Sequence, residues 1–240
     1  MNPPQRFRQG LAATVAALLG IAITLAAGAW QLDRADEKAR RQEQLEALRR
    51  EPPVSVPASA VAEGDLLYRR VRVGGSFAPE HTVYLDNRLR RGVPGFEIVT
   101  PLRIGDTERF VAVNRGWIAG ASRRDNLPEV RTPAGPVTVE GTVVPAQRVY
   151  QLEHAGPEGK VWLSFSVDRL RKESRLDLQP LLIQQESALD DGLERVWERP
   201  DSGRDKHLAY AFQWFAMAFA ILVIYVVLGF RRAATAHGPT

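Results

Sequence analysis

The sequence contains no cysteine. That absence excludes disulfide bonds, thiolate catalysis and cysteine-based zinc sites together. An external domain of this chain must therefore be held together by its core alone. Charged side chains are also missing from two long stretches, residues 11–30 and 209–230, one near each end of the chain.

Each uncharged stretch is strongly apolar and reaches the roughly 20 residues that an α-helix needs to cross a bilayer. We therefore predict two transmembrane helices, over residues 11–30 and 209–230. The first stretch follows Arg6 and Arg8 and carries small residues at 26–28, so a cleaved signal peptide is the alternative. Its apolar part is longer than the ~7–15 residues usual for a signal peptide.

The location of the charges predicts the orientation. Outside residues 31–206 the ionised residues are four arginines, and with these removed from the 32 basic residues, 28 remain against 28 acidic ones. Short basic tails stay in the cytoplasm, whereas long loops cross the membrane largely regardless of charge. The tails, residues 1–10 and 231–240, are predicted to be cytoplasmic. Basic residues at 34–41 argue mildly for the reverse orientation.

These features predict a multi-pass protein of a bacterial inner membrane, with its main domain in the periplasm; the Arg- and Ala-rich composition is typical of bacteria. The sequence pI is about 9.7, but the basic excess lies in the tails. A formally neutral domain has no surplus of cations to neutralise phosphates, so no nucleic-acid partner is expected.

Between the two apolar stretches we distinguish three segments. Residues 31–50 are charged and lack helix breakers, with acidic and basic residues spaced for i,i+4 pairs, which predicts a polar helical stalk. Residues 51–65 contain three prolines and small residues, which predicts a linker. Residues 66–206 are predicted to form the extracytoplasmic domain.

This domain shows period-two patterning typical of strands. A short helix is expected over residues 166–174, capped by Ser166. The fold class is therefore a membrane protein with two transmembrane helices flanking a β-rich α+β domain, mostly antiparallel sheet. The pattern does not decide whether the sheet closes into a barrel. Strands are expected within residues 68–77, 81–88, 95–104, 108–118, 136–144, 160–165 and 176–185.

No pattern indicates an enzyme. The chain lacks a phosphate loop and a dinucleotide fingerprint. Ser164, His154 and Asp168 include the residue types of a hydrolase triad, but no Gly-x-Ser-x-Gly elbow supports them. We predict a protein without catalytic residues.

Two Asn-Arg pairs end predicted strands. The guanidinium forks of Arg88 and Arg115 could bind a carboxylate or a haem propionate. The alternative, which we favour, is that the arginines pair with local acids while Asn87 and Asn114 make turns.

One face at the start of the second apolar stretch is a candidate cofactor site. His207, Tyr210 and Trp214 share this face at helical spacing, with Gln213 beside them. Histidine commonly holds haem iron, and aromatic rings pack on a flat macrocycle. The alternative is an interfacial belt in which Tyr, Trp and His lie at headgroup depth.

Four segments in order carry a family resemblance: "GAWQLDRADEK", "YLDNRLRRGVPGFEIVTPL", "FVAVNRGWI" and "KHLAYAFQWFAMA". Together with the two-span layout they resemble the Surfeit locus protein 1 family, membrane proteins that assist the assembly of haem-copper cytochrome oxidases. The resemblance extends from about residue 28 to residue 232.

The resemblance implies an assembly factor that helps deliver haem a to cytochrome c oxidase subunit I, with haem a synthase as a further candidate partner. In some bacterial members it implies that the histidine opening the second span, here His207, binds the haem iron. It does not extend to Tyr210, Gln213 or Trp214. The second axial ligand stays open, with water or Gln31 as candidates. The alternative function is a scaffold that stabilises subunit I without binding haem.

Overall fold

The computed structural model describes residues 9–120, 127–146, 159–197 and 203–235. It divides into two compact units. One comprises Met1–Gln44 and Arg199–Thr240, which contain most of the two long helices, and the other comprises Leu45–Glu198.

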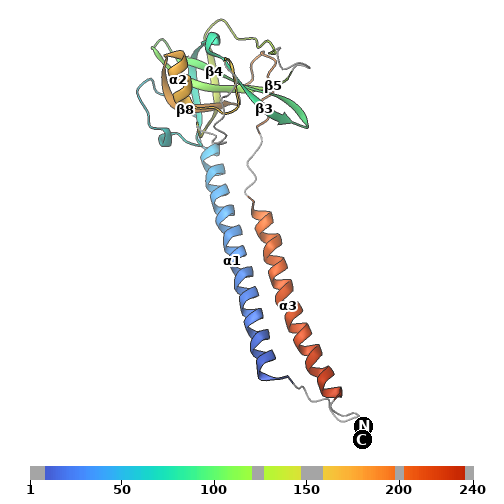
Figure 1. The fold of residues 1–240 in the computed structure, drawn as a ribbon. Coiled ribbons are helices and arrows are strands. Elements are labelled where there is room, and N and C mark those ends of the chain that lie inside the picture. Colours follow the sequence, from blue (N-terminus) through green and yellow to red (C-terminus); the bar gives the residue numbers. More distant parts are fainter. Residues whose placement is uncertain (1–8, 121–126, 147–158, 198–202, 236–240) are drawn as a thin grey trace. The chain divides into compact units, whose positions relative to one another are not determined.

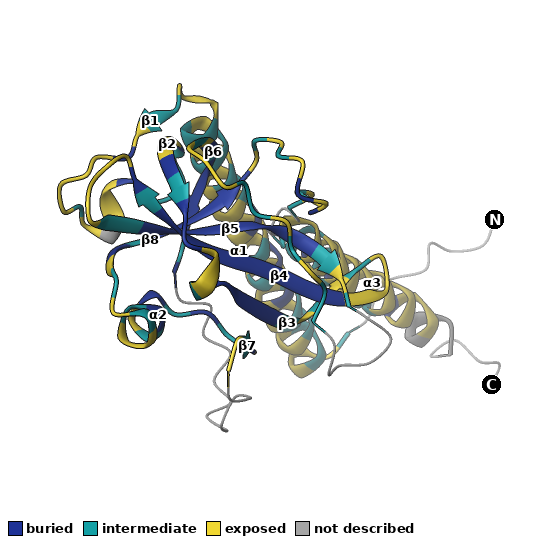
Figure 2. Cartoon of the chain, turned by 90° about the horizontal axis from the view of Figure 1, so that it is seen from above, coloured by how far each residue is buried: buried dark blue, intermediate teal, exposed yellow. Residues whose placement is uncertain are grey.

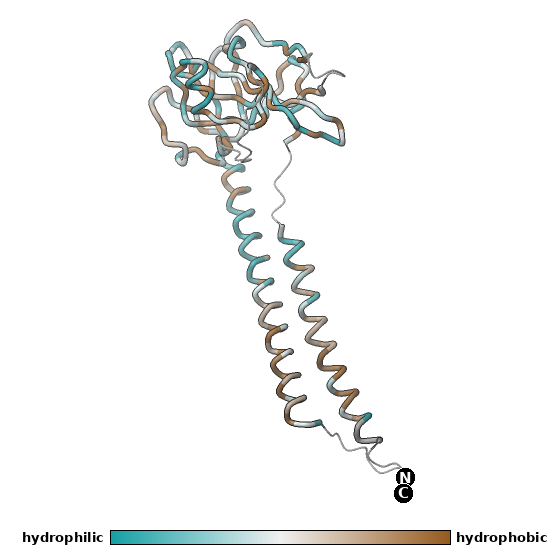
Figure 3. Tube along the Cα trace, in the orientation of Figure 1, coloured by the Kyte–Doolittle hydropathy of each residue, from teal (hydrophilic) through white to brown (hydrophobic). Residues whose placement is uncertain are grey.

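The two long helices are α1 (Leu11–Arg50) and α3 (Arg204–Thr235). Both contain a stretch that is long and apolar enough to cross a membrane. In α1 the helix continues without a break from the apolar stretch into the charged segment after residue 30 (Figure 3). Large apolar side chains are exposed along both helices, for example Leu18 at 62% and Phe212 at 74%. Such surfaces need an apolar surrounding.

The second unit is a β-domain with one short helix and two 3₁₀ turns (Figure 1). Each predicted strand segment contains one observed strand. The short helix α2 (Val167–Ser174) begins after Ser166, whose hydroxyl accepts the backbone N–H of Arg169, as predicted. The strands are β1 (Val54–Ser55), β2 (Arg70–Phe77), β3 (Val83–Arg90), β4 (Val93–Ile104), β5 (Arg109–Ala119), β6 (Val137–Val144), β7 (Val161–Trp162) and β8 (Asp177–Gln185), and the turns are η1 (Glu63–Asp65) and η2 (Pro79–His81).

Five strands close into a barrel, in the order β2-β6-β8-β5-β4, because β4 also pairs with β2. The pairs β1–β2, β3–β7 and β5–β8 are parallel, and the others are antiparallel. Glycine permits two of the close approaches. A Cβ on Gly75 would lie 1.7 Å from the carbonyl oxygen of Arg103 where β2 meets β4. One on Gly141 would lie 2.1 Å from that of Gln184, between β6 and β8.

The barrel interior is filled by alternate residues of the five barrel strands, since side chains of a strand alternate between its faces. The outer face of β4, β5 and β8 is buried as well, against α2 and Trp162. Figure 2 shows β4 and β5 mainly in the dark blue of buried residues. Burial on both faces explains the nearly continuous apolar runs of these strands. The interior cluster includes Val71, Val73, Leu102, Val111, Val113, Val139, Val143, Leu181 and Ile183.

Residues 51–65 do more than link. β1 pairs in parallel with β2, and Val56 is 6% exposed within the barrel cluster. The prolines in this segment favoured a linker in the sequence analysis. Proline is nevertheless tolerated beside an edge strand, which is the position of β1. The hairpin between β3 and β4 turns at Arg91 and Gly92, both with positive φ. The strand β4 begins directly after this turn, so it includes Pro94 as well as the predicted segment from residue 95.

Candidate functional site

The helices α1 and α3 contact each other through one face each. On α3 the residues of this face are spaced three or four apart, which is the spacing expected where two helices pack along each other. On α1 it carries small residues, which let helix backbones approach closely. A Cβ on Gly28 would lie only 2.6 Å from the Phe215 ring, so the helices are in close contact at this level. The α3 face includes the buried or half-buried His207, Ala211, Trp214, Phe215, Ala218, Ile221 and Tyr225.

Polar contacts join the two helices near the start of α1 and the end of α3. The hydroxyls of Thr14 and Tyr225 are 2.8 Å apart. The Gln9 side-chain amide donates to the Tyr225 carbonyl oxygen at 3.1 Å. Hydrogen bonds between apolar helices favour one register over its alternatives.

His207 lies in the first turn of α3 and is half-buried. Its Nδ1 is 2.7 Å from Oε1 of Gln31 on α1. Gln31 directly follows the uncharged stretch of α1, so the two polar side chains meet at the polar edge of the apolar helix pair. Sequence spacing within α3 could not show this contact, because its partner is 176 residues away.

The other predicted site residues divide between two faces of α3. Trp214 is half-buried on the face toward α1, like His207. Tyr210 is 54% exposed, and Gln213 is exposed too. The structure therefore brings His207 together with Gln31, while Tyr210 and Gln213 lie on the outer surface of α3.

This arrangement limits where a haem could lie. The Gly28–Phe215 contact leaves no room for a macrocycle between the helices at that level. The exposed surface of α3 beside His207 is open and carries an aromatic ring. Among the described residues no group of three or more His, Cys, Asp or Glu side chains could hold a metal ion. A single imidazole suits haem iron, because the porphyrin supplies the equatorial nitrogens.

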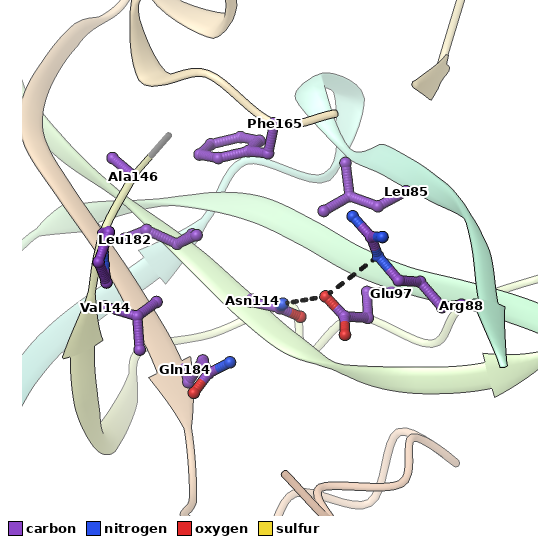
Figure 4. Close-up of a pocket in the computed structure, with 10 residues that line it drawn as sticks. Leu85, Arg88, Glu97, Asn114, Val144, Ala146, Phe165, Leu182 and Gln184 are labelled. Carbon is purple, nitrogen blue, oxygen red and sulfur yellow. Dashed lines mark hydrogen bonds and ion pairs between the residues drawn. The ribbon is translucent and has the colours of Figure 1, made fainter. Parts of the chain in front are cut away.

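A second polar cluster lies at the β-domain surface, in a cavity between β3, β4, β5 and β8 (Figure 4). Glu97 accepts from the Asn114 amide at 2.8 Å and lies 3.7 Å from Nε of Arg88. The cavity has a volume of about 10 Å³, which is enough for about one water molecule. It is far too small for a macrocycle. Apolar side chains of Leu85, Val144, Ala146, Phe165 and Leu182 complete its lining.

Arg115 lies at one end of the barrel interior. It is the extra residue of a β-bulge, since Val99 pairs with Asn114 while Ile98 pairs with Gly116. Its guanidinium is 3.0 Å from Asp191, and both side chains are fully buried. Burial lowers the pKa of Arg115, and the hydrogen bond to Asp191 opposes that shift. Further partners are Thr132 Oγ1, the Arg131 carbonyl oxygen and the Phe77 ring.

These contacts decide between the two hypotheses for the Asn-Arg pairs. Both arginines pair with acids of the chain, as favoured, and Arg115 is too buried to reach an external carboxylate. The turn predicted at Asn87 is wrong, because this residue lies within β3, with φ 60° at the β-bulge between Leu85 and Arg88. The turn predicted at Asn114 is wrong, because this residue is buried within β5 and bonded to Glu97.

The hydrolase residues give no site among the described residues. Asp168 is 2.6 Å from Arg171 on α2. Ser164 belongs to the described chain, but His154 lies outside it. His81 is half-buried in η2, with Nε2 3.8 Å from Glu80.

Comparison with known proteins gives a consistent result along most of the chain. The family model described as the SURF1 family matches residues 18–219. A SURF1-like protein of Rickettsia bellii is 28% identical over 232 residues, covering 92% of this chain and 91% of the relative. A SURF1-like protein of Monosiga brevicollis is 25% identical and covers 88% and 86%. Surfeit locus protein 1 of Rattus norvegicus is 24% identical and covers 80% and 68%. With a family match that runs from within α1, through the barrel, into α3, the chain belongs to the SURF1 family.

Proposed function

We propose that this protein is a membrane-anchored assembly factor of haem-copper oxidases, which holds haem a at His207 for delivery to cytochrome c oxidase subunit I. The observation that carries the proposal is the position of His207. It is half-buried at the polar end of an apolar helix, and among the residues that the structure describes one of its ring nitrogens, Nδ1, has a side-chain partner. Family membership supports the role in assembly.

The proposal includes a membrane topology. α1 and α3 cross a bacterial inner membrane, both tails are cytoplasmic and the barrel is periplasmic. Length and composition of the helices support the spans. The tail arginines support the orientation, since basic residues near span ends are retained in the cytoplasm.

The haem is a cargo in this proposal and supplies the redox-active iron of the oxidase after transfer. The protein's own part is to bind and orient it. His207 offers a ring nitrogen, and the exposed Tyr210 offers a ring for the macrocycle, while Trp214 packs toward α1. No bond of the cargo is made or broken by a catalytic residue, so the protein is not an enzyme.

A scaffold that binds subunit I without haem is the second candidate. The tip of the β3–β4 hairpin favours it, because Leu89 is 59% and Val93 47% exposed. Exposed apolar side chains on a hairpin tip are suited to a protein contact.

A deletion strain separates the two functions. Loss of the gene, with no second copy present, should lower oxidase activity and the haem content of subunit I. Complementation with His207→Ala should leave the haem content low if the protein delivers haem. Complementation to the wild-type level would support the scaffold instead.

A further inference from the structure

Gln31 is the nearest polar partner of His207. It lies on α1, one turn beyond Gly28, whose contact with Phe215 holds the helices together. Its Oε1 approaches Nδ1 of His207 at 2.7 Å, a short hydrogen bond in a part-buried position. The α1 helix continues for 19 further residues beyond Gln31, to Arg50, so this residue is not on a frayed end.

The chemistry of the two atoms determines the tautomer. An amide oxygen can only accept a hydrogen bond, so the proton of the neutral imidazole must be on Nδ1. Nε2 then keeps its lone pair. Histidines that bind a metal generally donate the other ring N–H to such an acceptor, which fixes the ring orientation and raises the basicity of the ligating nitrogen.

We propose that Gln31 is a positioning residue for His207: it holds the Nδ1–H tautomer and the ring orientation in which Nε2 is available to a haem iron. The iron contact rests on the function proposed above. The tautomer itself is a property of the protein before any haem binds. Gln31 is accordingly a partner of the histidine rather than an iron ligand, since its oxygen is already engaged.

Three variants of the full-length chain in detergent test the role. Gln31→Leu removes the acceptor at similar size, Gln31→Glu retains an acceptor of greater basicity, and Gln44→Leu is the matched control, an exposed glutamine farther along α1. Nitrogen-15 spectra of the haem-free proteins report the tautomer. His207→Ala identifies the His207 signals among those of the four histidines. Titration with haem a reports the affinity, and potentiometry the midpoint potential.

In Gln31→Leu we expect loss of the Nδ1–H preference and about 10- to 100-fold weaker haem a binding, the range for loss of such a partner. Gln31→Glu should restore binding and lower the midpoint potential, an effect that a purely structural role would not produce. Gln44→Leu should behave as wild type.

Two results would overturn the inference: an unchanged tautomer and affinity in Gln31→Leu, or an equal loss in Gln44→Leu. Failure of the proposed function is a different result. If wild type binds no haem a, the delivery role fails, while the tautomer spectra still decide whether Gln31 sets the state of His207.

Discussion

At the scale of single residues, the charges buried in the barrel have specific partners. Arg115 and Arg195 both reach Oδ2 of Asp191, at 3.0 and 2.5 Å. Asp191 also accepts the backbone N–H of Leu193 through Oδ1. One carboxylate therefore satisfies two guanidinium groups and orders the chain after β8.

Asp191→Ala should lower the free energy of unfolding by about 3–5 kcal/mol, because it leaves a fully buried guanidinium unpaired. Asp177→Ala is the control: it also removes an arginine partner, but its side chain is 61% exposed, and such pairs contribute at most about 1 kcal/mol. Denaturant unfolding of the full-length protein, followed by near-ultraviolet circular dichroism, measures both. Equal effects of the two substitutions would contradict the assigned role of Asp191.

At this scale the sequence allowed the kind of partner, an acidic residue, to be predicted for each arginine. It did not allow the identity of a distant partner or the position of a β-bulge to be predicted. The pairing of Arg88 and Arg115 with acids follows from the general cost of an unpaired charge. The identity of Asp191 does not, since it is 76 residues from Arg115 and shares no spacing with it. Asn114 was misread because turn propensity cannot reveal a bulge that buries the residue.

At the scale of elements, the packing of α1 on α3 depends on small side chains. Gly28→Val should force the helices apart, because even a Cβ would clash with the Phe215 ring. Ala29→Val is the control, since Ala29 is exposed on α1. Phe215→Ala should relieve the clash in the Gly28→Val background.

The absence of native cysteine allows spin labels on cysteines introduced at the exposed positions 18 and 223. The distance between the labels should increase in Gly28→Val, stay unchanged in Ala29→Val, and return in the double variant. An unchanged distance in Gly28→Val would show that the contact does not hold the helices together.

Most elements of the β-domain could be predicted because their strands either alternate or form short apolar runs rich in β-branched residues, with Gly and Pro between them. The closure of the barrel could not, because it depends on the pairing of β2 with β4, which periodicity does not encode. Gly75 and Gly141 were the only hints of closely approaching strands that we identify in the sequence. A glycine within a strand indicates that another backbone comes close, but it does not show which strand that backbone belongs to. β1 was missed since two residues show no period.

At the scale of the whole molecule, the proposed topology predicts the side of each segment. Reporter fusions after residue 10 and after residue 231 should report the cytoplasm, and a fusion at Gly120 the periplasm. The reason is that short basic tails are retained whereas the neutral domain crosses. Cytoplasmic activity at Gly120 would reverse the orientation and give weight to the basic residues at 34–41.

The central claim is that His207 holds haem a, and the most direct measurement is the Soret absorbance per mole of purified protein after co-expression with haem a synthesis enzymes. His207→Ala should lose most of the bound haem while reaching normal levels in the membrane, because alanine is the best helix former and preserves α3. Lys206→Ala should keep its haem, since a solvated ammonium is a poor iron ligand. Equal haem loading in wild type and both variants would contradict the claim and leave His207 as a residue at the membrane edge.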